Sequence, residues 1–203
     1  MEIMLDLETL GTTPGSVVMS IGAAAFDLYK GFQGRTFHAH VELQPQLDMG
    51  MTVSGSTIGW WLGQSDMARF GQTNAKRVTP LVALAEFGLW LRATRTSETE
   101  GIWAHGLNFD LPIIEALYFR LAAAGNTVVP PWSYRAGRDT RTLFGLANKK
   151  MGDFGTDNPV AHDALQDAIY QAQETSECFK YLQGQRVQRS AMTEPQPATS
   201  GDI

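Results

Sequence analysis

The sequence has a single cysteine, Cys178, in a chain of 203 residues. One cysteine excludes an intrachain disulfide and a zinc site with several cysteine ligands. Because Cys178 lies in a helix-like stretch, we expect a thiol packed in the core rather than redox chemistry. No apolar run approaches the ~20 residues of a membrane span, and the first residues lack the basic and apolar segments of a signal peptide. We therefore expect a soluble, cytoplasmic protein with no membrane partner.

Positive charge is also scarce, since 16 Lys and Arg residues face 21 Asp and Glu residues and the formal net charge is -5. This balance argues against a protein that coats long nucleic acid through a broad basic surface. It allows an enzyme that grips only a strand end, which needs few phosphate contacts. The 43% of hydrophobic residues suffice for one packed domain, expected over 1–184. Residues 185–203 are polar and are expected to form a disordered tail.

The spacing of apolar residues predicts an α/β fold. Patterns typical of strands cover about 2–8, 16–27, 35–43 and 101–105. Patterns typical of helices cover about 56–63, 80–94, 108–124, 140–146 and 161–182. A turn-rich stretch at 11–15 separates the first two strands and favours a β-meander. The order is three strands followed by alternating helices and strands.

Two carboxylates stand two residues apart in the first strand-like run, at Asp6 and Glu8. Residues at i and i+2 of a strand project from the same face, so these side chains would lie side by side. Like charges at a buried sheet edge repel each other and lose hydration unless a cation neutralises them. With no soft ligand nearby, the pair favours Mg2+ or Mn2+ over zinc.

Further acidic residues follow later in the chain. Asp110 comes after the strand at 101–105 and begins a helix, where a carboxylate suits the positive end of the helix dipole. Taken alone, it is more simply an ordinary helix-start residue. Asp163 and Asp167 lie four residues apart on the last helix, where like charges repel, and this indicates a metal ligand in at least one of them. His162 precedes both.

Three short motifs in this order resemble the exonuclease motifs of the DEDDh family. They have the forms Asp-x-Glu-Thr, Phe-Asp and His-x-Ala-x-x-Asp; each is weak alone, but the ordered set is specific. Their residues are Asp6, Glu8 and Thr9, then Phe109 and Asp110, then His162, Ala164 and Asp167. The resemblance spans about 1–182 and implies a ribonuclease H-like fold. Such a fold has a central mixed sheet of five strands, the first three antiparallel, flanked by helices.

Within that family, the chain looks most like the compact bacterial and phage branch that contains exoribonucleases and the nuclease portion of exodeoxyribonuclease VIII. Two segments carry this narrower resemblance. They are Gly59-Trp60-Trp61-Leu62, with Gln64 nearby, and Arg138-Asp139-Thr140-Arg141-Thr142-Leu143.

The resemblance implies hydrolysis with two Mg2+ or Mn2+ ions that clamp the scissile phosphate. By similarity, Asp6 would bind both ions, Glu8 and Asp167 the ion that activates water, and Asp110 the second ion. His162 would be the general base, and an unperturbed imidazole, which titrates near pH ~6.5, suits that role. Without the acidic set, a capping or surface histidine would be the better interpretation. Asp163 is then left as a helix-start residue.

Aromatic residues are the first candidates for substrate contacts. Trp60 and Trp61 project about 100° apart on a helix, so one can pack inward while the other faces a groove and stacks on a base. We assign the substrate contact to Trp61, although a position in the core is open for both. Phe109 stacks on a base or fills the core.

Three other residues complete the expected substrate site. By similarity, Thr9 and Leu10 would touch the terminal nucleotide. Arg138 belongs to a basic stretch before the third motif, which either binds phosphates or forms a solvated charged face.

These observations predict a metal-dependent 3'-5' exonuclease that releases nucleoside 5'-monophosphates from a single-stranded end, with a slight preference for RNA over DNA. A homodimer would fit the relatives. One alternative is a nucleic-acid-binding module of the same fold that has lost catalysis. Another is a phosphatase with Asp6 as its covalent nucleophile, which Glu8 and Thr9 fit poorly because they replace the Asp and Gly of that motif.

Overall fold

The computed structural model describes residues 1–95, 101–158 and 160–193, and β1 (Glu2–Thr9) lies inside its six-stranded sheet. The strand order is β4-β3-β2-β1-β5-β6. β1 pairs antiparallel with β2, and β2 with β3, whereas the other three pairings are parallel. The remaining strands are β2 (Val18–Asp27), β3 (Gly31–Val41), β4 (Arg77–Val78), β5 (Ile102–Ala104) and β6 (Gly137–Asp139).

The sheet confirms the predicted α/β class and the antiparallel arrangement of the first three strands, but it has six strands instead of five. β4 has only two residues, which pair with His40 and Val41 at the end of β3. β6 has three residues and pairs with β5. Runs this short contain no alternation of apolar and polar residues, so the pattern of the sequence could not reveal them.

The helices follow the predicted positions closely. α4 (Pro80–Thr94) has the expected bounds, while α2 (Gly55–Leu62), α5 (Leu107–Ala123) and α6 (Thr140–Ala147) differ by a residue. Two short helices, α1 (Gln44–Asp48) and α3 (Asp66–Thr73), were not predicted. α4 starts with the hydroxyl of Thr79 capping the N–H of Val82 and with proline in its first turn, both typical helix starts.

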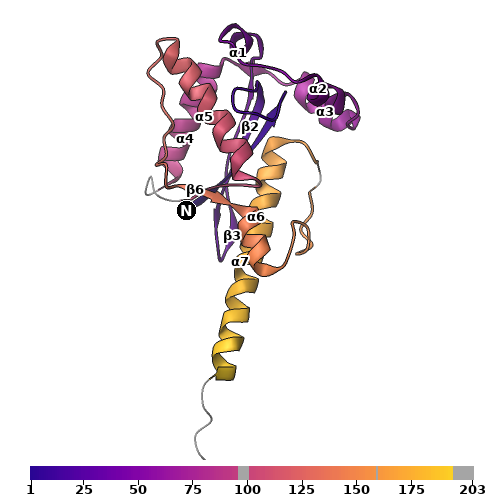
Figure 1. Cartoon of the computed structure of the whole chain (residues 1–203), viewed down its shortest axis with the longest axis vertical. Helices are drawn as coiled ribbons and strands as arrows, with labels where there is room; N and C mark the ends of the chain where they lie inside the picture. The colour runs from indigo at the N-terminus through magenta and orange to yellow at the C-terminus, as the bar shows by residue number, and fades with distance from the viewer. Residues whose placement is uncertain (96–100, 159, 194–203) are drawn as a thin grey trace, which may run out of the picture.

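The last helix, α7 (Ala164–Thr193), continues well past the expected end at residue 182. Residues 185–193, expected to belong to the tail, extend this helix beyond the sheet (Figure 1), and 194–203 lie outside the described residues. Cys178 on α7 is buried, as expected for a core thiol. In the described part of the chain, no helix combines the length and apolar character that a membrane crossing requires.

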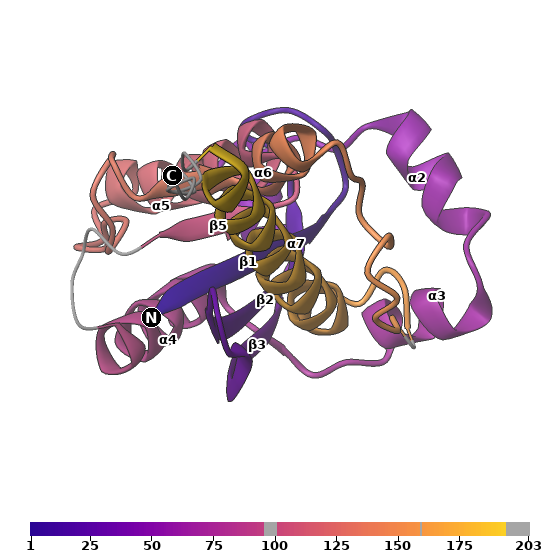
Figure 2. The ribbon, with the colours of Figure 1, turned by 90° about the horizontal axis from the view of Figure 1, so that it is seen from below.

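Both faces of β1 are covered, so successive residues of this strand pack on opposite sides of the sheet. Ile3, Leu5 and Leu7 pack into the main core with side chains of α4 and α5. Met4 points to the other face and packs against Ala168 and Ala172 of α7. α4 and α5 therefore lie on one side of the sheet and α7 on the other, while α2 and α3 project beyond its edge (Figures 1 and 2). Because side chains alternate along a strand, Asp6 and Glu8 share the α7 side with Met4.

A glycine in β2 brings α7 onto this face. Gly22 is the partner of Asp6 in the β1–β2 pairing. A Cβ at Gly22 would lie 2.1 Å from the backbone carbonyl of Ala164, the first residue of α7. Only glycine allows that approach, so the helix start lies directly beside Asp6.

Candidate active site

The first carboxylates come from the middle of the sheet and the start of α5. Asp6 and Glu8 lie on β1, two residues apart and on one face, and Glu8 is buried. Asp110 lies in the first turn of α5 and is also buried. Its Oδ1 accepts a hydrogen bond of 3.1 Å from the N–H of Leu7, the residue between the other two. The fold thus brings Asp110 to β1 from more than 100 residues away.

The remaining two candidates, His162 and Asp167, lie at the start of α7, on the side of the sheet opposite α5. The N–H of His162 donates to Oδ2 of Asp167 at 2.9 Å. Glu8, His162 and Asp167 each present a ligand atom, and these three atoms lie within 4.8 Å of one another. His162 has a φ of 66°, in the left-handed region, which directs the chain into the helix start. The structure therefore gathers the five residues that the motifs selected.

Asp163 has a different role from Asp167. Its Oδ1 accepts hydrogen bonds from the N–H groups of Leu165 (3.1 Å) and Gln166 (3.0 Å), which have no partner inside the helix. Asp163 is therefore the cap of α7, which confirms its interpretation as a helix-start residue.

Burial and mutual repulsion disfavour the charged forms of these carboxyl groups. Burial, followed by the charges of Asp167 and Asp163, raises the pKa of Glu8 to about 9. Burial raises the pKa of Asp110 to about 7 despite the hydrogen bond from Leu7. The pKa of Asp6 is raised by burial and by the neighbouring carboxylates, and that of Asp167 by burial. Among the described residues, no lysine or arginine forms an ion pair with these four.

Two amide side chains complete the surroundings of the carboxylates. Nε2 of Gln171 donates to Oδ1 of Asp6 at 2.8 Å, and Nδ2 of Asn158 donates to Oδ1 of Asp167 at 2.5 Å. The carbonyl oxygens of both amides are buried and accept no hydrogen bond from the described residues. A site of clustered carboxylates with unpaired amide oxygens beside them fits a hard divalent cation and its waters. Asp6, Glu8, Asp110 and Asp167 are the residues that could hold it.

Gln171 and Asn158 were missed by the sequence reasoning. Gln171 lies four residues after Asp167, so the helical spacing alone could have placed it on the same face of α7. Asn158 lies in a polar loop whose path no pattern indicates.

Three of the carboxylates, Asp6, Glu8 and Asp167, line a cleft of about 450 Å³. Its walls contain aromatic rings and hydroxyl groups. The lining residues are Asp6, Leu7, Glu8, Thr9, Thr12, Ser56, Thr57, Trp60, Trp61, Phe109, His162 and Asp167. Carboxylates and an imidazole in one cleft with apolar rings are typical of a site that binds an organic substrate.

The two tryptophans contribute differently to this cleft. Trp61 is only 8% exposed, and its Nε1 donates to the carbonyl oxygen of Thr9 at 2.9 Å. Trp60 is 46% exposed, and its ring centroid lies 4.8 Å from that of His162 in an edge-on arrangement. Both rings line the cleft, but the more exposed one is Trp60, whereas the substrate contact was expected from Trp61.

The other expected substrate residues are divided. Thr9 and Phe109 line the cleft together with Trp61. Leu10 packs against the core instead of lining the cleft. Arg138 also lies outside the lining, on the edge strand β6, where its guanidinium donates to the carbonyl oxygens of Arg135 and Gly137. Thr12, Ser56 and Thr57 line the cleft and were not predicted, because only the folded positions of the turn after β1 and of α2 bring them there.

Several solved structures share this fold. The nuclease domain of 3'hExo, described as a DEDDh family member bound to rAMP, has 12% identity and a TM-score of 0.52, over 90% of this chain and 91% of that chain. A full-length 3'-exonuclease has 14% identity and a TM-score of 0.53, over 88% of this chain and 80% of that chain. E. coli exonuclease I in complex with a dA16 oligonucleotide has 15% identity and a TM-score of 0.51, over 97% of this chain and 46% of that chain. The chain thus spans less than half the length of exonuclease I.

At these identities the structural neighbours establish the fold, and the family is established by sequence. No curated protein matches the chain. Residues 1–179 match the family described as "3'-5' exoribonuclease Rv2179c-like domain", a region that contains all five residues of the acidic site. The chain therefore belongs to the Rv2179c-like 3'-5' exoribonuclease domain family.

Proposed function

We propose that this protein removes nucleoside 5'-monophosphates one at a time from the 3' end of single-stranded nucleic acid, in a reaction that requires two Mg2+ or Mn2+ ions. The observation that carries the proposal is the meeting of four carboxylates, two buried and two half-buried, with His162 at an aromatic cleft that three of them line. Asp6 would bind both ions, Glu8 and Asp167 would serve the first, and Asp110 the second. When bound, the ions supply an acidified water and positive charge for the leaving 3' oxygen.

His162 is proposed as the general base. A ring nitrogen accepts a proton from the water while the water oxygen forms a bond to phosphorus and the bond from phosphorus to the 3' oxygen breaks. The backbone N–H of His162 is hydrogen-bonded to Asp167, and the Trp60 ring lies beside the imidazole. Both contacts restrict where the imidazole can lie. The rate contribution expected of such a base is ~10²- to 10⁴-fold.

The cleft walls are proposed to hold the terminal nucleotide. The exposed face of Trp60 and the ring of Phe109 are suited to stacking on bases, which is tolerant of base identity. Thr9 lines the same cleft, and Trp61 fixes its carbonyl. Leu10, expected to touch the terminal nucleotide, and Arg138 do not line the cleft and are left out of this proposed nucleotide site.

We further propose a slight preference for RNA over DNA, which the exoribonuclease description of the family supports. Discrimination would rest on contacts to the 2'-hydroxyl, and the hydroxyl groups of Thr12, Ser56 and Thr57 lie in the cleft wall. A cytoplasmic location and a homodimer are also predicted, and each needs its own measurement.

The test is digestion of matched 5'-labelled single-stranded RNA and DNA oligonucleotides, resolved on a denaturing gel with Mg2+, Mn2+ or EDTA. The proposal predicts a metal-dependent ladder that shortens from the 3' end, with RNA degraded somewhat faster. Retained binding of the oligonucleotides without any ladder would favour the silent binding module instead. A trapped phosphoenzyme would favour the phosphatase.

A further inference from the structure

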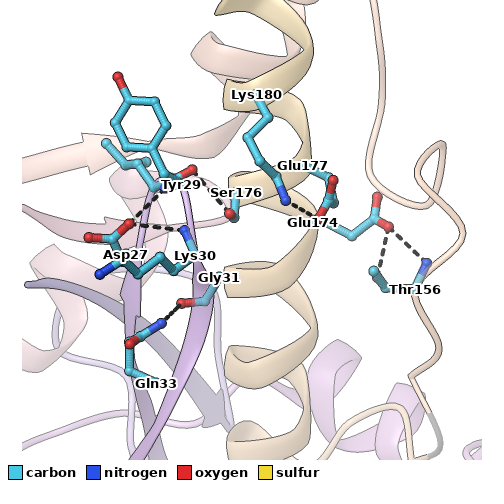
Figure 3. Close-up of polar contacts among 11 residues, drawn as sticks. Asp27, Tyr29, Lys30, Gly31, Gln33, Thr156, Glu174, Ser176, Glu177 and Lys180 are labelled. Atoms are coloured by element: carbon cyan, nitrogen blue, oxygen red, sulfur yellow. Dashed lines mark hydrogen bonds and ion pairs between the residues drawn. The ribbon is translucent and has the colours of Figure 1, made fainter.

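Glu174 on α7 is fully buried and holds one loop by four hydrogen bonds. Its Oε2 accepts from the N–H groups of Gly152 (2.8 Å) and Phe154 (3.4 Å). Its Oε1 accepts from the N–H (3.1 Å) and the hydroxyl (2.7 Å) of Thr156, as Figure 3 shows. No lysine or arginine of the described chain pairs with this carboxylate. Loop donors alone therefore compensate for its burial.

The position of Glu174 on the helix connects this anchor with the active site. Asp167, Gln171 and Glu174 have the spacing i, i+4, i+7, which places them on one face of α7. Asp167 faces His162, Gln171 binds Asp6, and Glu174 binds the loop. One helix face thus carries the candidate metal ligand and the two groups that fix its surroundings.

The anchored loop leads to the active site. Two residues after Thr156, the side-chain amide of Asn158 donates to Oδ1 of Asp167. The N–H of His162 donates to the other oxygen of the same carboxylate. Asp167 therefore has one oxygen on Asn158 and one on His162, and both partners follow the segment that Glu174 binds.

We propose that Glu174 is a positioning residue for the nuclease reaction. It fixes residues 152–156 so that Asn158 and His162 lie against Asp167. This inference rests on the proposed function, in which His162 is the general base. Glu174 lies outside the cleft lining, and Trp60 and Phe109 come from other elements. Its loss should therefore lower kcat far more than it changes KM for the oligonucleotide.

The test compares Glu174→Gln with Glu177→Gln. The amide in Glu174→Gln has one oxygen, so loop N–H groups lose an acceptor. Glu177 lies three residues further along α7, is half-exposed and pairs with Lys180 at 2.5 Å, which makes it a matched control (Figure 3). Thr156→Val removes only the hydroxyl donor and serves if Glu174→Gln fails to fold.

We expect Glu174→Gln to lower kcat by about 10- to 100-fold at neutral pH, with KM changed less than ~3-fold. Above neutral pH, the rate of Glu174→Gln should keep rising as that of His162→Ala does, because hydroxide can replace a His162 ring that is out of position. Thr156→Val should lower kcat by about 2- to 10-fold. A rate of Glu174→Gln equal to that of Glu177→Gln, or a pH profile of wild-type shape, would overturn the proposal.

A second measurement separates this inference from the proposed function. The chain has four histidines, so histidine-selective 15N labelling gives few signals. Glu174→Gln should shift the His162 signal but leave that of His105, whose Nδ1 lies 2.8 Å from the Thr140 hydroxyl. An unchanged His162 signal overturns the positioning role even if the enzyme is active. A shifted signal in a protein without nuclease activity supports the positioning and refutes the function.

Discussion

Gly22 of β2 contacts the backbone of Ala164 at the start of α7 so closely that a Cβ at position 22 would lie 2.1 Å from the Ala164 carbonyl. We predict that Gly22→Ala displaces the start of α7 and with it His162 and Asp167. Nuclease activity should fall by more than ~100-fold, and the free energy of unfolding by about 1–3 kcal/mol or more. Gly145→Ala, in open space on α6, should be neutral or slightly stabilising in the same denaturation and activity measurements.

Asp163 and Asp167 can be distinguished by the same conservative change. Asp167→Asn removes a proposed metal ligand and should lower kcat by about 10²- to 10⁴-fold, as should Asp6→Asn. Asp163→Asn keeps an oxygen that caps α7, so its activity should be near that of the wild type. Steady-state kinetics on a labelled oligonucleotide checks this. Near-wild-type turnover in Asp167→Asn would refute the metal assignment.

The metal-free protein should lose stability as pH rises from 7 to 9. Glu8 holds its proton up to a pH of about 9 when folded, whereas a glutamate of the unfolded chain loses it near pH ~4.3. The folded state thus binds more protons, and the free energy of unfolding falls with pH. His38, His40 and His105, whose pKa values are lowered mainly by burial, act oppositely but only up to the unfolded pKa near ~6.5.

The measurement is thermal unfolding in EDTA at pH 7, 8 and 9. Glu8→Gln should make the decline less steep, since it removes one of the carboxyl groups whose pKa is raised; Asp6, whose pKa is also raised by burial and by its neighbouring carboxylates, keeps its share. Excess Mg2+ or Mn2+ should raise Tm most at pH 9, because metal binding requires the deprotonated carboxylates. A Tm that rises between pH 7 and 9 without metal would contradict the burial of Glu8 in its protonated form.

The two tryptophans should respond differently to removal. Trp60→Ala should raise KM for single-stranded substrate by about 5- to 100-fold, the loss expected for one stacked base, with little change in stability. Trp61→Ala should lower the free energy of unfolding by about 3–5 kcal/mol, because Trp61 is buried and bonded to Thr9. Trp60→Phe keeps a ring and should bind nearly as well as the wild type. Chemical denaturation with oligonucleotide titration separates these effects.

The residues of the acidic site were predictable because their chemistry leaves a trace in sequence. Two carboxylates in an apolar strand, at Asp6 and Glu8, conflict with burial unless a function explains them. The order of the motifs then selected Asp110, His162 and Asp167. Long amphipathic helices such as α4 were predictable for the same reason, since their pattern repeats over several turns.

Other parts of the site depend on tertiary contacts that no local pattern encodes. Gly22 lies among small residues of β2. Glycine is required at this position only because the backbone of Ala164 comes so close to it. The roles of Trp60 and Trp61 depend on how α2 lies against β1, which helical spacing alone does not determine. The role of Glu174 depends in the same way on the loop at 152–156, which folds against it and has no marker in the sequence.

The alternation of β1 makes the chain intolerant of length changes at one place. Leu5 and Leu7 face the core that α4 and α5 cover, while Asp6 and Glu8 face α7. Inserting or deleting one residue between positions 3 and 8 would exchange the two sets, with carboxylates in the apolar core and leucines in the cleft. An insertion in the exposed turn at residues 12–14 would leave both sets in place. Natural variants of this enzyme should therefore differ in length at their loops but keep the residue count of β1.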